Sequence, residues 1–198
     1  MENVPFFVFD TLYFIEKKMV SIDYRVKVKK RNVMAQLWLE EMYEKYKQDL
    51  FRFLFVILRD TQEAEDALQD TFFKAYLHGN GAKNMFQEKS WLYKIARNTA
   101  YDMLRKRKRE FPTEKEQIEV ALEEQAQQSE MDGNLFYLEM LASLNKTEQE
   151  IVSLKIIGGL THKDIGKVLH MTTASVKKRY ERALNKLKET YKEAGENE

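Results

Sequence analysis

The sequence predicts an all-α protein with two small helical domains, which we place at residues 34–110 and 134–198 and join by a flexible acidic linker at 111–133. Apolar residues recur at three- and four-residue spacing through both domains, which puts them on one face of a helix. The chain holds only two prolines and seven glycines in 198 residues, so few residues interrupt helices. Between the domains, Glu114 to Asp132 contains seven acidic residues and one basic residue. Such a segment is a poor core former, and we expect it to be partly disordered.

Residues 1–33 fit poorly with this pattern, and we treat them as an N-terminal extension of uncertain role. Val4 to Ile15 is apolar, but a membrane span needs roughly 18 consecutive apolar residues. Basic residues follow this segment, whereas in a signal peptide they precede it. We therefore expect no membrane insertion. Because the regular pattern begins at Met34, one hypothesis is that the natural start of translation lies there.

Two helices are predicted at the start of the first domain. One spans residues 35–58, and Asp60 then caps the next, with Glu63 three residues on completing a capping-box arrangement. This second helix runs through Tyr76. The apolar stripe of the first helix is Leu37, Met42, Tyr43, Tyr46, Leu50, Phe51, Leu54 and Leu58. That of the second is Ala64, Ala67, Leu68, Thr71, Phe72, Ala75 and Tyr76.

The opposite face of the second helix is acidic and carries one large aromatic side chain. It is either a protein-docking surface or an ordinary solvated face. Because isolated exposed apolar residues are common on proteins, the pattern by itself favours the solvated face. The residues of this face are Glu63, Asp66, Gln69, Asp70 and Phe73.

Residues 78–89 interrupt the helical pattern with a Gly-Asn-Gly sequence and are predicted to form a loop. Met85 and Phe86 have no helical stripe to join there, so they either fill a local core or line a pocket. Ser90 follows as the expected N-cap of the next helix.

The helix from Ser90 to Arg109 has one buried face and one basic face, and it ends in five consecutive cations from Arg105 onward. Cations hold phosphates while aromatic rings and amides meet bases, so this face suits nucleic acid. A solvated basic helix end, which the helix dipole favours, explains the pattern equally well. The buried face comprises Trp91, Leu92, Ile95, Ala96, Thr99, Ala100, Met103 and Leu104, and the basic face comprises Lys94, Arg97, Asn98, Tyr101 and Arg105.

The second domain is predicted to begin near Asn134 with an apolar helical stripe. Thr147 with Glu150 supplies a capping box for the following helix, and two glycines at 158–159 end that helix. The stripe of the first of these helices is Leu135, Leu138, Leu141, Ala142 and Leu144.

A short helix capped by Thr161 and Asp164, a break at 170–172 and a last helix from Thr173 to Tyr191 complete the domain. A short helix, a tight turn and a longer helix with a basic outer face form a helix-turn-helix, whose second helix enters the DNA major groove. A plain helical bundle is the alternative, and the pattern favours DNA binding. The last helix buries Val176, Tyr180, Ala183, Leu184 and Leu187, and its outer face holds Lys177, Lys178, Glu181, Arg182 and Asn185.

Composition narrows the range of functions. The chain has no cysteine, which removes disulfides, thiolate zinc sites and thiol nucleophiles, and fits a cytoplasmic location. The net charge is only +1, so affinity for nucleic acid must come from segregated charge. The three histidines show no metal-ligand spacing, and no phosphate loop or nucleophile motif occurs. We expect no metal, no cofactor and no catalytic residue.

Three sequence blocks carry a family resemblance. They are AEDALQDTFFKAY at 64–76, SWLYKIARNTAYDMLRKRKR at 90–109 and LNKTEQEIVSLKIIGGLTHKDIGKVLHMTTASVKKRYERALNKLKE at 144–189. In this order, with a polar linker between the second and third, they resemble an extracytoplasmic-function (group IV) sigma factor of the sigma-70 family. The resemblance covers about Glu41 to Lys188.

The resemblance implies a role for each face. The first domain would be sigma region 2, whose acidic helix docks on the beta-prime clamp helices of bacterial RNA polymerase core through Asp66, Gln69, Asp70 and Phe73. A flipped base of the minus-10 element would enter a pocket, and the DNA would continue along the basic helix, which assigns to the minus-10 element Asn84, Met85, Phe86, Lys94, Arg97, Asn98, Tyr101 and Arg105. The second domain would be sigma region 4, bound to the minus-35 element by Lys177, Lys178, Glu181 and Arg182.

The expected function is therefore that of a sigma factor, which directs core polymerase to promoters and promotes strand opening, and which in this family often serves a stress response. The beta flap of the polymerase and an anti-sigma factor are implied partners, although no residue identifies the latter. Lys178 and Glu181 are not the commonest choices at their positions, so the minus-35 sequence is not predictable. The alternative is a stand-alone helix-turn-helix transcriptional regulator.

Overall fold

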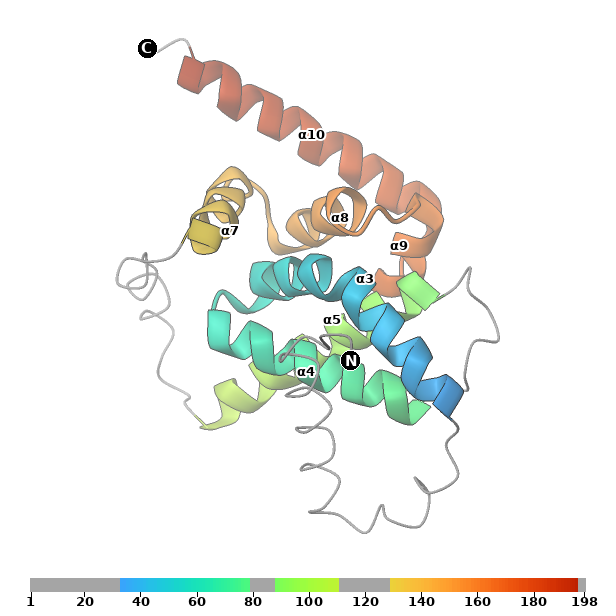
Figure 1. The fold of residues 1–198 in the computed structure, drawn as a ribbon. Helices are drawn as coiled ribbons and strands as arrows, with labels where there is room; N and C mark the ends of the chain where they lie inside the picture. The colour runs from blue at the N-terminus through green and yellow to red at the C-terminus, as the bar shows by residue number, and fades with distance from the viewer. Residues whose placement is uncertain (1–32, 79–87, 111–128, 196–198) are drawn as a thin grey trace.

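A computed structural model describes residues 33–78, 88–110 and 129–195, and every element within these ranges is an α-helix (Figure 1). The all-α prediction is confirmed for this part of the chain, whereas the predicted extension at 1–33 and most of the predicted linker at 111–133 lie outside it. The helices are α3 (Val33–Leu58), α4 (Thr61–His78), α5 (Glu88–Glu110), α7 (Ser129–Met140), α8 (Lys146–Ile156), α9 (His162–Leu169) and α10 (Thr173–Gly195).

The core of the first domain lies where α3, α4 and α5 meet. The predicted stripe of α4 is buried throughout, and that of α3 is buried or half-buried from Met42 onward. Aromatic rings join the helices in edge-to-face geometry, with centroids 5.0 Å apart for Tyr43 and Phe72 and 5.3 Å apart for Phe53 and Tyr93. Such pairs contribute about 0.5–1.5 kcal/mol beyond their buried area.

Tyr93 is fully buried, although the sequence pattern assigned it to neither face of α5. The reason is that α5 is enclosed on a wider arc than a surface helix, since α3, α4 and α9 all pack against it. Burial raises the pKa of the Tyr93 hydroxyl. Periodicity alone identifies a single apolar stripe and therefore missed this residue.

The helix starts of the first domain follow the predictions in part. Asp60 caps α4 as expected, because its Oδ1 accepts a 2.7 Å hydrogen bond from the backbone N–H of Glu63. The Glu63 carboxylate, however, accepts a 2.9 Å hydrogen bond from Arg107 at the far end of α5. The helix α5 begins at Glu88, so Ser90 lies buried in its first turn and is not its N-cap.

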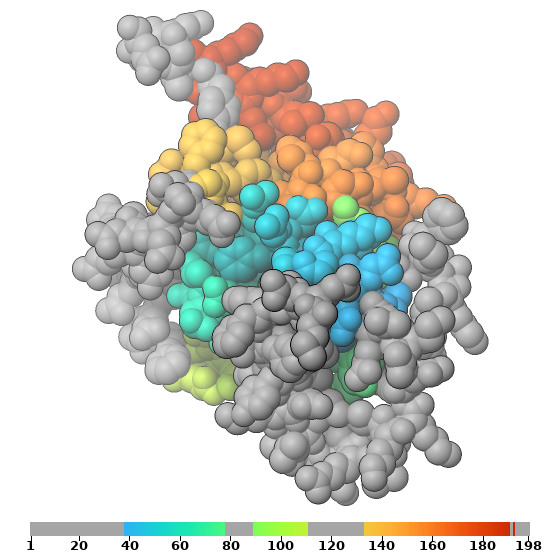
Figure 2. All heavy atoms as spheres, in the orientation of Figure 1, coloured from blue at the N-terminus to red at the C-terminus, as the bar shows by residue number. Residues whose placement is uncertain are grey.

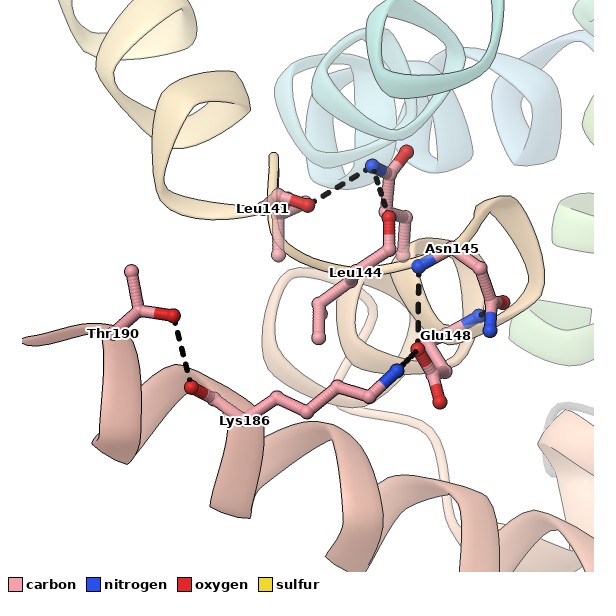
Figure 3. A network of polar contacts seen from close by, with 7 residues as sticks. Leu141, Leu144, Asn145, Glu148, Lys186 and Thr190 are labelled. Atoms are coloured by element: carbon pink, nitrogen blue, oxygen red, sulfur yellow. Dashed lines mark hydrogen bonds and ion pairs between the residues drawn. The ribbon is translucent and has the colours of Figure 1, made fainter.

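The predicted capping box of α8 was wrong by two residues. Asn145 is the N-cap, and its side chain accepts from the backbone N–H of Glu148 at 3.0 Å, while the Glu148 carboxylate accepts from the Asn145 backbone at 3.2 Å. Asn is a better N-cap than Thr, and it stands three residues before a Glu as the motif requires. Figure 3 shows this box and Lys186 of α10, which joins it from across the domain. Because Glu148 completes the box, the Glu150 side chain takes no part in this cap.

The helix-turn-helix is present as predicted, with α9 as its first helix and α10 as its second. Thr161 caps α9 by accepting from the backbone N–H of Asp164 at 3.2 Å. His170 ends α9 in the left-handed conformation with φ of 56°, and its backbone reverses the chain toward α10. At Gly166 a Cβ would lie 2.6 Å from the backbone oxygen of Met171, so only glycine allows the turn to approach this closely.

The second domain lies directly on the first, as the ribbon and the packed spheres both show (Figures 1 and 2). Here α7 and α8 contact α3, and α9 contacts α5. In contrast, α10 packs on α8 and α9 at the side of the molecule away from α4. None of the described helices is long and apolar enough to cross a bilayer.

Candidate polymerase and nucleic-acid interfaces

The acidic face of α4 is accessible to solvent. Asp66 is exposed, and Gln69, Asp70 and Phe73 are half-exposed along the same side of the helix. Phe73 also packs against the core with part of its ring, which fixes its direction. Burial raises the pKa of Glu63 at the start of this face, while the guanidinium of Arg107 opposes that rise. The structure therefore places the four predicted polymerase-binding residues on one surface.

The basic face of α5 is divided between solvent and the second domain. Asn98 and Arg105 are exposed, and Arg105 pairs with Asp102 one turn away. Lys94 is half-exposed. Arg97 and Tyr101 instead meet the second domain, so the prediction that all five side chains line a free outer face was wrong for these two.

The contact that covers Arg97 and Tyr101 is made by Glu150 of α8. Its Oε2 lies 2.5 Å from Nε of Arg97, and its Oε1 accepts a 2.6 Å hydrogen bond from the Tyr101 hydroxyl. The Arg97 guanidinium also lies over the Tyr101 ring, 4.6 Å from its centroid. Burial and the hydrogen bond to Glu150 raise the pKa of Tyr101 to about 12.

A second polar contact joins the domains beside the first. Arg59, in the left-handed backbone between α3 and α4 with φ of 61°, donates a 2.6 Å hydrogen bond to Oε1 of Gln149. The Gln149 amide nitrogen donates to the backbone oxygens of Leu141 and Leu144, each at 2.9 Å (Figure 3). Gln149 thus links the turn before α8 to the first domain.

No pattern in the sequence indicates that Arg59, Gln149 and Glu150 join the two domains. The sequence pattern predicts Glu150 as part of the capping box of α8. The Asn145 and Glu148 pair is the signal that could have corrected this, because once these two form the box Glu150 has no local partner. No sequence pattern links residues that lie 49 to 90 positions apart.

The cationic end of α5 is partly neutralised within the first domain. Arg107 pairs with Glu63 at 2.9 Å, and Lys106 lies 3.9 Å from Glu110. Lys108 and Arg109 are exposed. Arg107, Lys108 and Arg109 also lie in the last turn, where the helix dipole favours positive charge.

The outer face of α10 is open along the predicted DNA-binding positions. Lys177, Lys178, Glu181 and Arg182 are all exposed, while Val176, Ala183 and Leu187 on the other side are buried against α8 and α9. Lys177 and Glu181 form an exposed pair at 3.9 Å, a geometry that contributes little stability. Since α10 is the second helix of the motif, this exposed face is the candidate for a major-groove contact.

Three of the predicted minus-10 residues are not among those that the structure describes. Asn84, Met85 and Phe86 lie outside the described residues. Among the described residues, no group of three or more His, Asp and Glu side chains is arranged to hold a metal ion.

Comparisons with known proteins identify both domains. Residues 42–110 match the family model of sigma-70 region 2, and residues 137–187 match that of sigma-70 region 4. The chain is 30% identical to the ECF RNA polymerase sigma factor SigM of Bacillus subtilis over 157 residues, which cover 77% of this chain and 94% of SigM. It is 32% identical to the RNA polymerase sigma factor SigV of the same organism, over 70% of this chain and 82% of SigV.

Solved structures share the fold. The chain matches the sigma factor RpoE, crystallised with the anti-sigma factor NepR from Bartonella quintana, with a TM-score of 0.57, 24% identity, and coverage of 77% of this chain and 98% of RpoE. It matches CnrH, in complex with the cytosolic domain of CnrY, with a TM-score of 0.58, 19% identity, and coverage of 79% and 89%. With matches to both region models in order and a full-length relative, the chain belongs to the extracytoplasmic-function sigma factors of the sigma-70 family.

Proposed function

We propose that three faces of this sigma factor divide the work of promoter recognition. The α4 face of Asp66, Gln69, Asp70 and Phe73 docks on the beta-prime clamp helices of RNA polymerase core. The α5 face of Lys94, Arg97, Asn98, Tyr101 and Arg105 binds the minus-10 element, with Asn84, Met85 and Phe86 at the flipped base. The α10 face of Lys177, Lys178, Glu181 and Arg182 reads the minus-35 element, and the beta flap contacts the second domain.

The observation that carries this division is the position of the three faces. The α4 and α5 faces belong to one packed three-helix core, so a polymerase docked on α4 holds α5 at a defined place on the DNA. The α10 face belongs to the other domain and is exposed. Two DNA elements separated by a spacer are suited to two modules joined by a linker.

The chemistry of each face fits its assigned partner. Cations position phosphates, while the amide of Asn98 and the ring of Tyr101 can meet bases that have left the stack. In the major groove, Lys and Arg donate to guanine and Glu accepts from cytosine. Members of this family are not enzymes, and strand opening requires only that binding to the unpaired strand offset the cost of unstacking.

An anti-sigma factor is the proposed regulator. RpoE, a structural neighbour, is complexed with the anti-sigma factor NepR, and CnrH with the cytosolic domain of CnrY. By analogy, a partner of this kind binds the present chain and masks its polymerase-docking and DNA-binding faces.

Run-off transcription tests the proposal. The purified chain and core polymerase are incubated with a library of genomic fragments, and transcript starts are mapped. We expect initiation at sites that share a minus-35 and a minus-10 element. Arg97→Ala should lower initiation at these sites, whereas Arg52→Ala, a matched change at an exposed arginine of α3, should not. Duplex binding without initiation would instead support the stand-alone regulator.

A further inference from the structure

The Glu150 carboxylate presents anionic oxygens to α5, as a DNA phosphate would. Its carboxylate offers two anionic oxygens, one to the Arg97 guanidinium and one to the Tyr101 hydroxyl, at 2.5 Å and 2.6 Å. Arginine binds carboxylates and phosphates through the same donors. The Glu150 side chain is only 6% exposed and that of Arg97 only 23%, so no DNA backbone reaches Arg97 while this contact stands.

We propose that the second domain holds the chain in a closed, self-inhibited state in which Glu150 occupies the minus-10 strand's position on Arg97 and Tyr101. This inference rests on the proposed role of α5 in minus-10 binding. DNA and Glu150 compete for the same donors, so opening of the domains precedes engagement of the minus-10 strand. The apparent affinity for that strand is then reduced by the fraction of chains that are open.

The interface is suited to a reversible contact. Among the described residues, side-chain hydrogen bonds cross it from Arg59 to Gln149, from Arg97 to Glu150 and from Tyr101 to Glu150. A buried carboxylate is costly without a partner, but domain separation returns Glu150, Arg97 and Tyr101 to water together. The closed state therefore gains little from the ion pair itself, and an anionic competitor displaces Glu150 at low cost.

Closure affects the two DNA-binding faces differently. The α10 face, with Lys177, Lys178 and Arg182, is exposed in the closed state, because α10 lies on the side of the second domain away from the first (Figure 1). The closed chain thus keeps its minus-35 face free while part of its minus-10 face is covered. A free sigma factor in this state is inhibited toward single-stranded DNA and not toward duplex DNA.

The competition is measured with the full-length chain and a random-sequence pool of single-stranded DNA. Glu150→Gln keeps the shape of the side chain and removes the charge, and we expect it to bind the pool about three- to tenfold more tightly than wild type. Glu139→Gln is the matched control, since Glu139 is an exposed carboxylate of the same domain, and it should bind as wild type does. Binding to duplex minus-35 DNA should not change in either variant.

A second variant opens the interface without touching Glu150 or α5. Arg59→Asn removes the contact to Gln149 and places at the left-handed position a residue that tolerates it. Since the chain has no cysteine, Glu65→Cys and Lys188→Cys introduce one dye site on each domain. We expect lower energy transfer between the dyes in Glu150→Gln and in Arg59→Asn than in the otherwise unchanged labelled chain.

The outcomes separate this inference from the proposed function. Equal binding by wild type, Glu150→Gln and Arg59→Asn, with weaker binding by Arg97→Ala, would overturn self-inhibition and leave the role of α5 standing. If Arg97→Ala changes neither single-strand binding nor run-off initiation, the role of α5 falls, and this inference with it. Unchanged energy transfer in both interface variants would also overturn the closed state.

Discussion

Lys186 of α10 donates a 2.8 Å hydrogen bond to the carboxylate of Glu148, which at the same time completes the capping box at the start of α8 (Figure 3). Only 2% of the Glu148 side chain is exposed. This one carboxylate therefore accepts from the backbone N–H of Asn145 at the start of α8 and also anchors α10, which carries the proposed minus-35 face, to α8. This contact acts together with the buried Val176, Ala183 and Leu187 to hold α10 on the rest of the domain.

Glu148→Gln should lower the free energy of unfolding by about 1–2 kcal/mol at neutral pH, because the charge-assisted hydrogen bond to Lys186 becomes a neutral one. Burial alone would raise the pKa of Glu148, but hydrogen bonds from Lys186 and the Asn145 backbone outweigh it and lower the pKa below 4.5. A lowered carboxyl pKa stabilises the fold above the unfolded value and loses that stabilisation as pH falls.

The difference between wild type and Glu148→Gln should therefore shrink as pH decreases below about 4.5. Urea unfolding followed by circular dichroism at a series of pH values measures it. Lys188→Ala, at an exposed position of the same helix, serves as the control and should change stability little. A difference that stays constant down to acid pH would contradict the role assigned to the Glu148 charge.

Gly158→Ala should destabilise the second domain by about 1–3 kcal/mol, because a Cβ at this position would lie 2.5 Å from the backbone oxygen of Leu154. The backbone would have to shift where α8 turns toward α9. Gly133→Ala is the matched control, since nothing lies within 4 Å of its Cβ and it lies inside α7. That change should raise stability by about 0.5–1 kcal/mol. Thermal unfolding of both variants tests the contrast, and equal effects would contradict it.

Asp66→Lys should weaken binding to RNA polymerase core by at least about tenfold, because it reverses an exposed charge of the proposed docking face. Glu65→Lys reverses an equally exposed charge one position earlier, about 100° around the helix, and should bind nearly as wild type does. Fluorescence anisotropy with purified core measures both affinities. Equal loss in the two variants would indicate a general charge effect and no specific face.

Lys178→Ala should weaken binding to the minus-35 duplex by about 1–3 kcal/mol if Lys178 contacts a base, with a changed preference at one position. A phosphate contact would instead weaken binding to all sequences and reduce the slope of affinity against salt by about one. Titrations of mapped promoter fragments at several salt concentrations distinguish a base contact from a phosphate contact. Lys188→Ala, near the other end of α10, is the control, and identical losses in both would argue against the assigned face.

Much of the fold and of the candidate site could be predicted from the sequence, because these features depend on residues that are close together in the chain. The α4 stripe from Ala64 to Tyr76, the cap at Asp60 and the turn at His170 are all determined by residues within a few positions of one another. The same holds for the exposed face of α10, since a helix that buries Val176 and Ala183 must expose Lys178 and Arg182.

The tertiary structure decided what lies against each face. The sequence determined that α5 carries Arg97 and Tyr101 on its basic side, but only the packing of the second domain places Glu150 between them and solvent. Tyr93 is buried for the same reason, because other helices enclose α5 on a wide arc. Helical periodicity sets the direction of a side chain relative to its own helix, whereas its partner depends on long-range packing, for which a single sequence carries no periodic signal.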